Sequence, residues 1–191
     1  MWLPFLSCLP FTEFENRFVY IKRIDFPPKM NIFFLSFNPK EAAEHHCDKH
    51  VVKMILETAQ LLYSAHWNEE RLILPQNAYK KAHFNHPCAI WTRESLANYM
   101  WLAELGYWLC VEYRFRYGNK EHKTEAHLNW LRKNPPPSLK DIGITEIRLA
   151  MPFEYKRPNP VEAYRTYYRE NKLKVRGIVK YTKRSPPTFL A

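Results

Sequence analysis

The sequence has few of the residues on which several common site types depend. It contains only four glycines in 191 residues, and none of them forms a Gly-rich phosphate-binding loop. Its four cysteines are too sparse and irregular for a disulfide scaffold and include no Cys-x-x-Cys pair, which favours reduced thiols in an intracellular protein. No apolar run approaches the roughly 18 residues of a membrane span. We therefore expect no membrane partner and a location in the cytoplasm or nucleus of a host cell.

Acidic residues are also scarce relative to basic ones. The chain carries 29 Lys and Arg against 19 Asp and Glu, a net charge of +10, and the excess is concentrated late in the sequence. Residues 155–184 hold ten Lys and Arg against two Glu, interleaved with tyrosines. Such a tract suits the phosphate backbone of double-stranded DNA, with tyrosines available to stack on bases or to fix the tract to the domain. The alternative is a solvated basic tail.

The apolar fraction of 46% predicts one domain with a substantial core. The first 29 residues are rich in aromatic residues and broken by prolines, but they lack the cationic start of a secretory signal. Met30, in contrast, is followed by an apolar run that is typical of the start of a folded domain. We predict that residues 1–29 are an N-terminal extension and that residues 30–191 form a single helical domain, which includes the basic segment 155–184.

Helix start signals divide this domain into elements. Asn38 can cap a helix that begins at Pro39, and Asn85 or His86 can cap one that begins at Pro87. The second helix carries many aromatic residues, which we expect to pack against the first. The predicted elements are an extended segment, Ile32–Phe37, and helices Pro39–His66, Pro87–Tyr117, Lys123–Arg132 and Val161–Lys172. The sequence thus predicts a mostly α, compact, single-domain fold with two long helices and one short N-terminal extended segment.

The first long helix bears a polar stripe along one face of an otherwise apolar surface. Its members follow one another at spacings of three or four residues: His46, His50, Lys53, Glu57, Gln60 and Ser64. Burying such groups is costly unless they pair, form hydrogen bonds or line a cleft, so packing alone does not explain the stripe. Glu57 lies one turn beyond Lys53, which predicts an ion pair whose partly buried setting suits acid–base chemistry. A structural ion pair on a partly exposed face is the alternative.

Two histidines of the stripe also suggest a metal site. His46 and His50 are four residues apart, the spacing at which a helix presents two ligands to one ion, and His86 offers a third. The segment lacks the glutamate of the His-Glu-x-x-His motif, and Lys49 beside the pair repels a cation. A metal-dependent nuclease or hydrolase that uses the three histidines is therefore an alternative, and the favoured interpretation has no metal and no cofactor.

The start of the second long helix is a candidate anion site. A helix N-terminus presents unpaired N–H groups and the positive end of the helix dipole, which favour phosphate. The residues around this start are His83, Asn85, His86 and Arg93. The alternative is that Asn85 serves only as a helix cap.

The run Cys47–Leu62, followed by Asn85-His86-Pro87 and Trp91, resembles the pyrimidine dimer DNA glycosylases, the endonuclease V type of bacteriophages. The similarity covers residues 30–118. It implies a compact helical protein of phage or viral origin that breaks the glycosidic bond of a damaged pyrimidine in DNA. In that family an N-terminal α-amine attacks the sugar carbon and a glutamate on an early helix assists. The resemblance assigns that glutamate to Glu57, and it assigns contacts to phosphate or base to His50, Lys53 and Arg93.

The sequence departs from this family at the nucleophile. Met30 is followed by Asn31, whose side chain is too large for easy removal of the methionine, and residues 1–29 would displace the amine. Lys49 or Lys53 could then form the imine with the sugar instead.

Together these patterns predict a DNA repair or DNA-processing enzyme, an N-glycosylase with or without lyase activity that acts on damaged or modified pyrimidines. The predicted catalytic residues are Glu57, Lys53 and His50. The predicted nucleic-acid contacts are His46, Lys49, His83, Asn85, His86, Arg93, Arg165, Arg169, Lys172 and Lys174. Besides the metal-dependent nuclease, a non-catalytic nucleic-acid-binding protein that uses the stripe as its groove is an alternative.

Overall fold

The computed structural model describes residues 30–71, 74–173 and 179–191, and within these ranges the protein is helical with no strand. The α-helices are α1 (Pro39–Glu44), α2 (Asp48–His66), α3 (Pro87–Thr92), α4 (Leu96–Arg116), α5 (Glu125–Lys133) and α6 (Pro160–Tyr167). A short 3-10 helix, η1 (Phe153–Tyr155), precedes α6, a π-helical turn, η2 (Tyr168–Leu173), follows it, and a second 3-10 turn, η4 (Thr188–Leu190), lies near the C-terminus. The predicted mostly α class is confirmed, whereas the predicted extension 1–29 lies outside the described residues.

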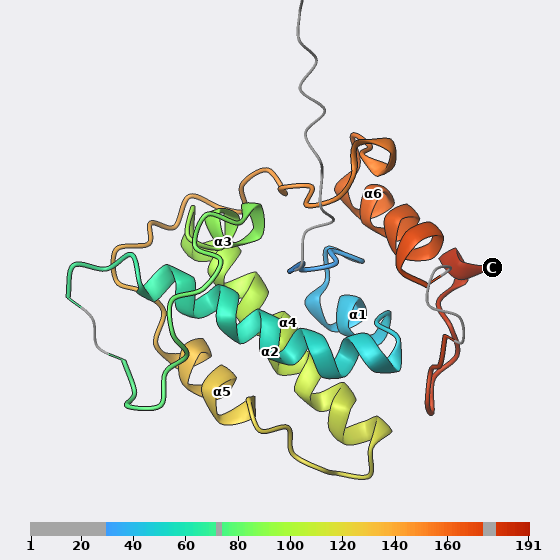
Figure 1. Cartoon of the computed structure of the whole chain (residues 1–191), viewed down its shortest axis with the longest axis horizontal. Coiled ribbons are helices and arrows are strands. Elements are labelled where there is room, and N and C mark those ends of the chain that lie inside the picture. Colours follow the sequence, from blue (N-terminus) through green and yellow to red (C-terminus); the bar gives the residue numbers. More distant parts are fainter. Residues whose placement is uncertain (1–29, 72–73, 174–178) are drawn as a thin grey trace, which may run out of the picture.

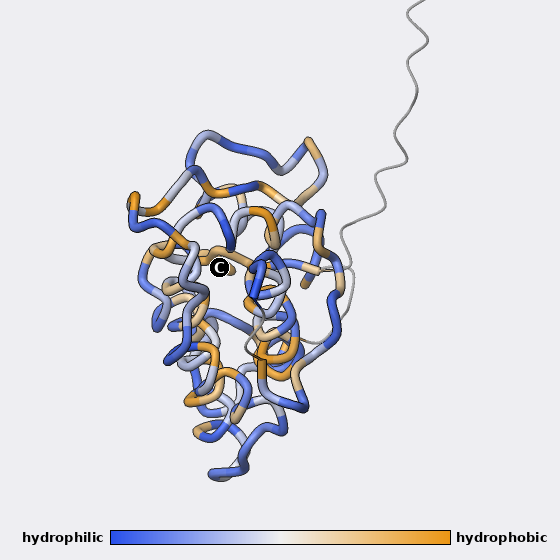
Figure 2. Tube along the Cα trace, turned by 90° about the vertical axis from the view of Figure 1, so that its left-hand side faces the viewer, coloured by the Kyte–Doolittle hydropathy of each residue, from blue (hydrophilic) through white to orange (hydrophobic). Residues whose placement is uncertain are grey.

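Helices α2 and α4 cross at the centre of the molecule, with α5 below them, α1 and α6 to one side and α3 above (Figure 1). Gly106 of α4 allows this close packing, because a Cβ atom there would lie 2.7 Å from Leu128 and 2.9 Å from Thr58. Figure 2 shows hydrophobic residues along the helices of the interior and hydrophilic residues along most of the outer loops. No helix in the described ranges is both long and apolar enough to cross a membrane.

The first predicted long helix is in fact two helices. Helix α1 ends at Glu44 with His45 as its C-cap, and Cys47, whose backbone is extended, is the N-cap of α2. His46 therefore lies in the turn between the two helices. Carbonyl groups freed by this break accept hydrogen bonds from Arg116 of α4. The prediction of one helix over Pro39–His66 is therefore wrong at a position where a residue far along the chain satisfies the interrupted backbone.

The second predicted long helix is also divided. Thr92 ends α3 and its hydroxyl donates to the carbonyl of Cys88, after which Ser95 caps α4 by accepting from the amide of Asn98 at 3.0 Å. Of the two candidate caps for α3, the structure selects His86, whose Nδ1 accepts from the amide of Cys88 at 3.2 Å. Local side-chain hydrogen bonds thus break a helical pattern that periodicity alone predicts as continuous.

The segment 30–36 is buried and has no regular secondary structure. It passes between α2 and the α6 side of the molecule (Figure 1), where the ring of Phe33 stacks on His50 with 4.9 Å between centroids. The ring of Phe34 stacks on Trp101 of α4 at 4.2 Å. This segment therefore covers part of the polar face of α2.

Candidate functional site

A closed ionic network surrounds the N-terminal end of α2. The side chain of Arg116 has no exposed surface and donates to Asp48 at 3.1 Å and to Glu112 at 3.0 Å. Glu112 also pairs with Arg184, which reaches Glu44 at 3.2 Å. Every charge in this network has an opposite charge beside it, so the network can hold the C-terminal segment against α1, α2 and α4 without an external ligand.

Asp48 joins this network to the C-terminal segment. Its carboxylate accepts the backbone N–H and the hydroxyl of Thr182 at 3.0 and 2.7 Å, and its own backbone N–H donates to the carbonyl of Lys180 at 2.9 Å. Burial alone would raise the pKa of Asp48, but the hydrogen bonds from Thr182 and Arg116 lower it below its usual value. These contacts make Asp48 an anchor for the chain.

His46 lies in the core beside this network. Its ring has no exposed surface, its Nδ1 lies 2.6 Å from the carbonyl of Ala42, and burial lowers its pKa to about 4. A neutral, enclosed imidazole offers no surface to a phosphate. The predicted nucleic-acid contact by His46 therefore finds no support in the structure.

The remaining members of the polar stripe do share one face of α2. His50 is buried, and its Nδ1 lies 2.8 Å from the hydroxyl of Tyr168. Ser64, at the far end, donates to the carbonyl of Leu61 at 2.6 Å and Gln60 is half-buried. The residues at both ends of the stripe thus have structural partners within the fold. The candidates for a functional role are the residues at its centre.

Lys53 and Glu57 form that centre. Lys53 Nζ lies 2.9 Å from Glu57 Oε1, with 46% of the lysine side chain exposed and 9% of the glutamate side chain exposed. The other carboxylate oxygen, Oε2, accepts the backbone N–H of Asn31 at 3.2 Å. Glu57 is therefore a nearly buried carboxylate held by one amide and by one cation that reaches solvent.

The sequence did not identify Asn31 as a partner of Glu57. Asn31 is fixed by its side chain, whose Nδ2 donates to the carbonyl of Ala150 at 2.8 Å and whose Oδ1 accepts the amides of Ile32 and Phe33. Asn followed by an apolar run was visible as a turn signal, but the residue it serves lies 26 positions along the chain. No local pattern connects the two.

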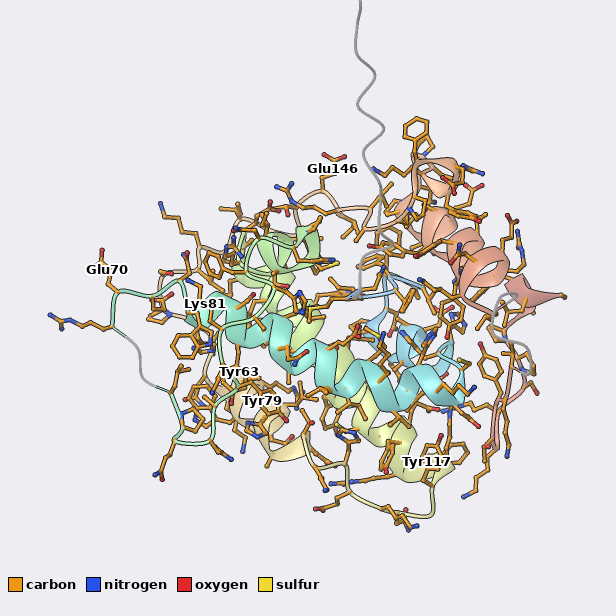
Figure 3. The ribbon with its side chains drawn as sticks, in the orientation of Figure 1. Tyr63, Glu70, Tyr79, Lys81, Tyr117 and Glu146 are labelled. Atoms are coloured by element: carbon orange, nitrogen blue, oxygen red, sulfur yellow. The ribbon has the colours of Figure 1, made fainter. Side chains whose placement is uncertain are left out.

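A hollow of about 440 Å³ opens beside the first turns of α2. Its lining includes Lys49, His50 and Val52 of α2, Lys172 and Lys180 from the C-terminal region, and Tyr117 at the end of α4. Figure 3 labels Tyr117 there, and its hydroxyl donates to the carbonyl of Asp48 at 3.4 Å. Since Lys49 and Lys53 are one turn apart on α2, cations border both the hollow and the Lys53–Glu57 pair.

Helix α3 packs against α2, and its start lies near Glu57. The Cys88 thiol is fully buried, and its pKa is raised to about 12 by burial first and by the charge of Glu57 among lesser causes. His86 caps the helix, and burial lowers its pKa. The structure thus places α3 against α2 as the sequence suggested, with the Cys88 thiol close enough to Glu57 for its charge to contribute to the raised pKa.

The residues predicted to bind an anion at the start of α3 do not converge on one site. Asn85 and His83 are exposed. Arg93 donates to the carbonyl of Phe84 at 2.6 Å and stacks on its ring at 4.0 Å, so its guanidinium is engaged within the loop. Because α3 has only six residues and these groups do not converge, the structure gives no defined anion site here.

Two arginines and three tyrosines of the basic segment contact the rest of the fold. Arg165 donates to the carbonyl of Leu35 at 2.8 Å, and Arg169 donates to that of Phe189 at 3.0 Å. Lys172 lies over the ring of Tyr167 at 4.8 Å, and Lys174 lies outside the described residues. The fully buried tyrosines of the segment are Tyr164, Tyr167 and Tyr168. Of the two roles considered for the tyrosines, these three fix the segment to the domain.

The metal alternative finds no support in the part of the chain that the structure describes. There, no three His, Cys, Asp or Glu side chains gather as metal ligands. His46 and His50 each turn Nδ1 to a partner within the fold.

Comparisons with protein-family models, curated proteins and solved structures found no match for this chain.

Proposed function

We propose that this protein is a DNA-processing enzyme, an N-glycosylase that releases damaged or modified pyrimidines, and that Lys53 and Glu57 form its catalytic pair. The observation that carries this proposal is the setting of Glu57, a nearly buried carboxylate paired with a solvent-exposed lysine at 2.9 Å. Cleavage of a glycosidic bond develops positive charge on the sugar, and a carboxylate beside the sugar stabilises that charge or activates water.

The surroundings of Glu57 fit an anionic ligand. Lys49, Lys172 and Lys180 line the neighbouring hollow, and Lys53 reaches solvent beside it. Ammonium groups spaced along a helix and the segment next to it suit successive phosphates of a DNA strand. Val52, next to Lys53, and Leu56, one turn beyond Val52 on α2, have exposed apolar side chains that offer contact area to a base or sugar.

Lys53 has two possible tasks beside Glu57. As a charge partner its ammonium group pairs with the carboxylate. As a nucleophile its neutral amine, having given a proton to Glu57, attacks C1′ of the deoxyribose as the C1′–N bond breaks; the electron pair of that bond goes to the base, which takes up a proton. Opening of the sugar ring would convert the adduct to an imine, which is the intermediate of lyase chemistry.

Base release is the direct test of the proposed function. Duplex oligonucleotides carrying oxidised, deaminated or crosslinked pyrimidines are incubated with the purified chain, and free base and abasic sites are measured. We expect release from at least one class of lesion, at the same rate for Lys133→Gln, a matched change of an exposed lysine on α5. If the wild-type chain releases no base from any of these duplexes, the proposed function is wrong.

Borohydride trapping identifies the amine. Reduction of an imine would leave a covalent adduct, and peptide mass mapping would place it on Lys53; Lys53→Gln should then abolish the adduct. The backbone nitrogen of Asn31, 3.2 Å from Glu57, is an amide in this chain and does not attack. An adduct that persists in Lys53→Gln and maps to residue 31 would instead reveal an α-amine created by processing before Asn31. Base release without any adduct would leave Lys53 as the charge partner.

A further inference from the structure

Phe153 has the most exposed large apolar side chain in the described residues, with 81% of its surface open to solvent. No aromatic ring or cation of the described ranges contacts its ring. By contrast, the exposed Phe37 packs edge-on against Phe34, and the exposed Phe115 lies near the cations of Lys183 and Arg184. Exposure of a single apolar side chain is common and does not by itself indicate a partner, so the setting of the Phe153 ring decides what it can bind.

The backbone that carries Phe153 is held in place. In η1 the amide of Tyr155 donates to the carbonyl of Pro152 at 3.2 Å, and that of Lys156 donates to the carbonyl of Phe153 at 3.0 Å. The ring of Tyr155 packs on Tyr167 of α6 with 5.2 Å between centroids. Phe153 is therefore presented by an ordered turn at the edge of the molecule, just before α6 (Figure 1). Little conformational entropy remains to be lost when the ring binds.

Two cations, Lys156 and Arg157, lie three and four positions after Phe153, beyond Glu154 and Tyr155. Arg157 donates to the carbonyls of Glu154 and Lys156, each at 2.8 Å, and no carboxylate pairs with it in the described ranges. Lys156 likewise has no carboxylate partner there, although its side chain borders a hollow of about 730 Å³ along the segment 142–149. An exposed aromatic ring with two unpaired cations matches a stacked, negatively charged polymer.

The turn is linked to the catalytic pair by a short chain of contacts. The carbonyl of Ala150, three residues before Phe153, accepts from the side chain of Asn31, whose backbone N–H donates to Glu57. Three residues span at most about 11 Å. These contacts limit the separation of Phe153 from Glu57 to a length that a short stretch of duplex, with successive base pairs about 3.4 Å apart, can span.

We infer that Phe153 inserts into the base stack of the bound DNA and holds open the place left by the nucleotide presented to Glu57. This inference rests on the proposed function. A base inside a duplex is out of reach of the carboxylate, and enzymes that act on bases commonly unstack them, with apolar side chains wedged into the gap. A membrane surface is the less suitable partner, because one aromatic ring and two cations provide little apolar area for anchoring.

Fluorescence of 2-aminopurine placed opposite a tetrahydrofuran abasic analogue in a duplex tests the inference. Binding of the wild-type chain should raise the fluorescence as the base leaves the stack. Phe153→Ala should lose this rise and bind the duplex about tenfold more weakly or worse, the size expected for one lost aromatic–base stack. Phe153→Trp should restore both, and Ile142→Ala, which removes another highly exposed apolar side chain, should behave as the wild type.

The outcomes separate this inference from the proposed function. Unchanged affinity and an unchanged fluorescence rise in Phe153→Ala would overturn the wedge, while base release by the same variant would leave the glycosylase proposal standing. Conversely, Phe153-dependent unstacking without base release by the wild type would support the wedge and remove the glycosylase. Loss of binding to phosphatidylserine vesicles in Phe153→Ala, with binding to the duplex unchanged, would also overturn the inference in favour of a membrane contact.

Discussion

Two buried carboxylates of α2 sit in opposite kinds of surroundings. Asp48, at the start of the helix, meets Arg116 and two donors of Thr182, and its cation is itself fully enclosed. Glu57, about two turns further along, meets one backbone amide and Lys53, whose side chain is nearly half exposed. The same helix therefore carries one closed ion pair and one open one.

The difference shows why residue type and burial do not by themselves identify a site. In the closed pair both the carboxylate and the guanidinium form several hydrogen bonds within the protein, and we expect the pair to contribute stability and to anchor the chain. In the open pair the lysine can leave the carboxylate and contact a ligand without unfolding anything. We therefore assign structure to Asp48 and chemistry to Glu57.

Breaking the closed pair should have the largest effect on stability. Arg116→Met leaves Asp48 and Glu112 buried, with Glu112 keeping only Arg184, and removes the donors to two backbone carbonyls. We expect the free energy of unfolding to fall by about 3–5 kcal/mol, measured by urea denaturation. The control is Arg132→Met, which breaks the exposed pair with Glu104 and should cost about 1 kcal/mol or less. Equal losses in the two variants would show that the network is not the anchor described here.

Acid should weaken the closed region next. The pKa of His46 is about 4 in the folded protein, below the 6.5 of the free side chain, so the unfolded chain binds more protons between these values. Stability is then fully present above pH 6.5 and is lost as the pH falls toward 4, by about 3 kcal/mol for a shift of this size. His46→Leu should have a flatter profile of unfolding free energy against pH. A profile as steep as that of the wild type would contradict the buried, neutral assignment of His46.

Opening the second pair should have the smallest effect on stability. Lys53→Gln removes a side chain that is nearly half exposed, so we expect the free energy of unfolding to change by about 1 kcal/mol or less. Its affinity for a duplex oligonucleotide should fall, and the dependence of affinity on salt should become less steep because one phosphate contact is lost. A large loss of stability with unchanged DNA affinity would make Lys53 a structural residue.

Local patterns predicted much of the fold, because the information lay close by in the sequence. Asn38 caps α1 through hydrogen bonds to residues two and three positions on, and the apolar periodicity of α2 needs no distant partner. The break at His46 was missed, since it depends on Arg116, seventy positions away. Helix caps and apolar periodicity therefore predicted the helical segments, but they did not predict that the helix beginning at Pro39 ends before His46.

The same distinction holds for the candidate site: contacts between neighbours in the sequence were predictable, and contacts between distant segments were not. The pairing of Lys53 with Glu57 follows from their separation of one helical turn and is present. The role of Asn31 and the use of Arg165 on a backbone carbonyl depend on contacts between distant segments. The exposure of Phe153 could not be predicted from the sequence, because the five residues between Pro152 and Pro158 are too few to show a periodicity that separates buried from exposed positions.

The central claim is that Glu57 acts in chemistry and not in support of the fold, and one measurement tests it most directly. The single-turnover rate of base release is compared for wild type and Glu57→Gln at saturating DNA, with Glu104→Gln as the control for a partly exposed carboxylate of another ion pair. We expect Glu57→Gln to bind DNA and fold as the wild type does but to release base at least about 100-fold more slowly, the usual size of an acid–base contribution. An unchanged rate in a folded Glu57→Gln protein would contradict the account.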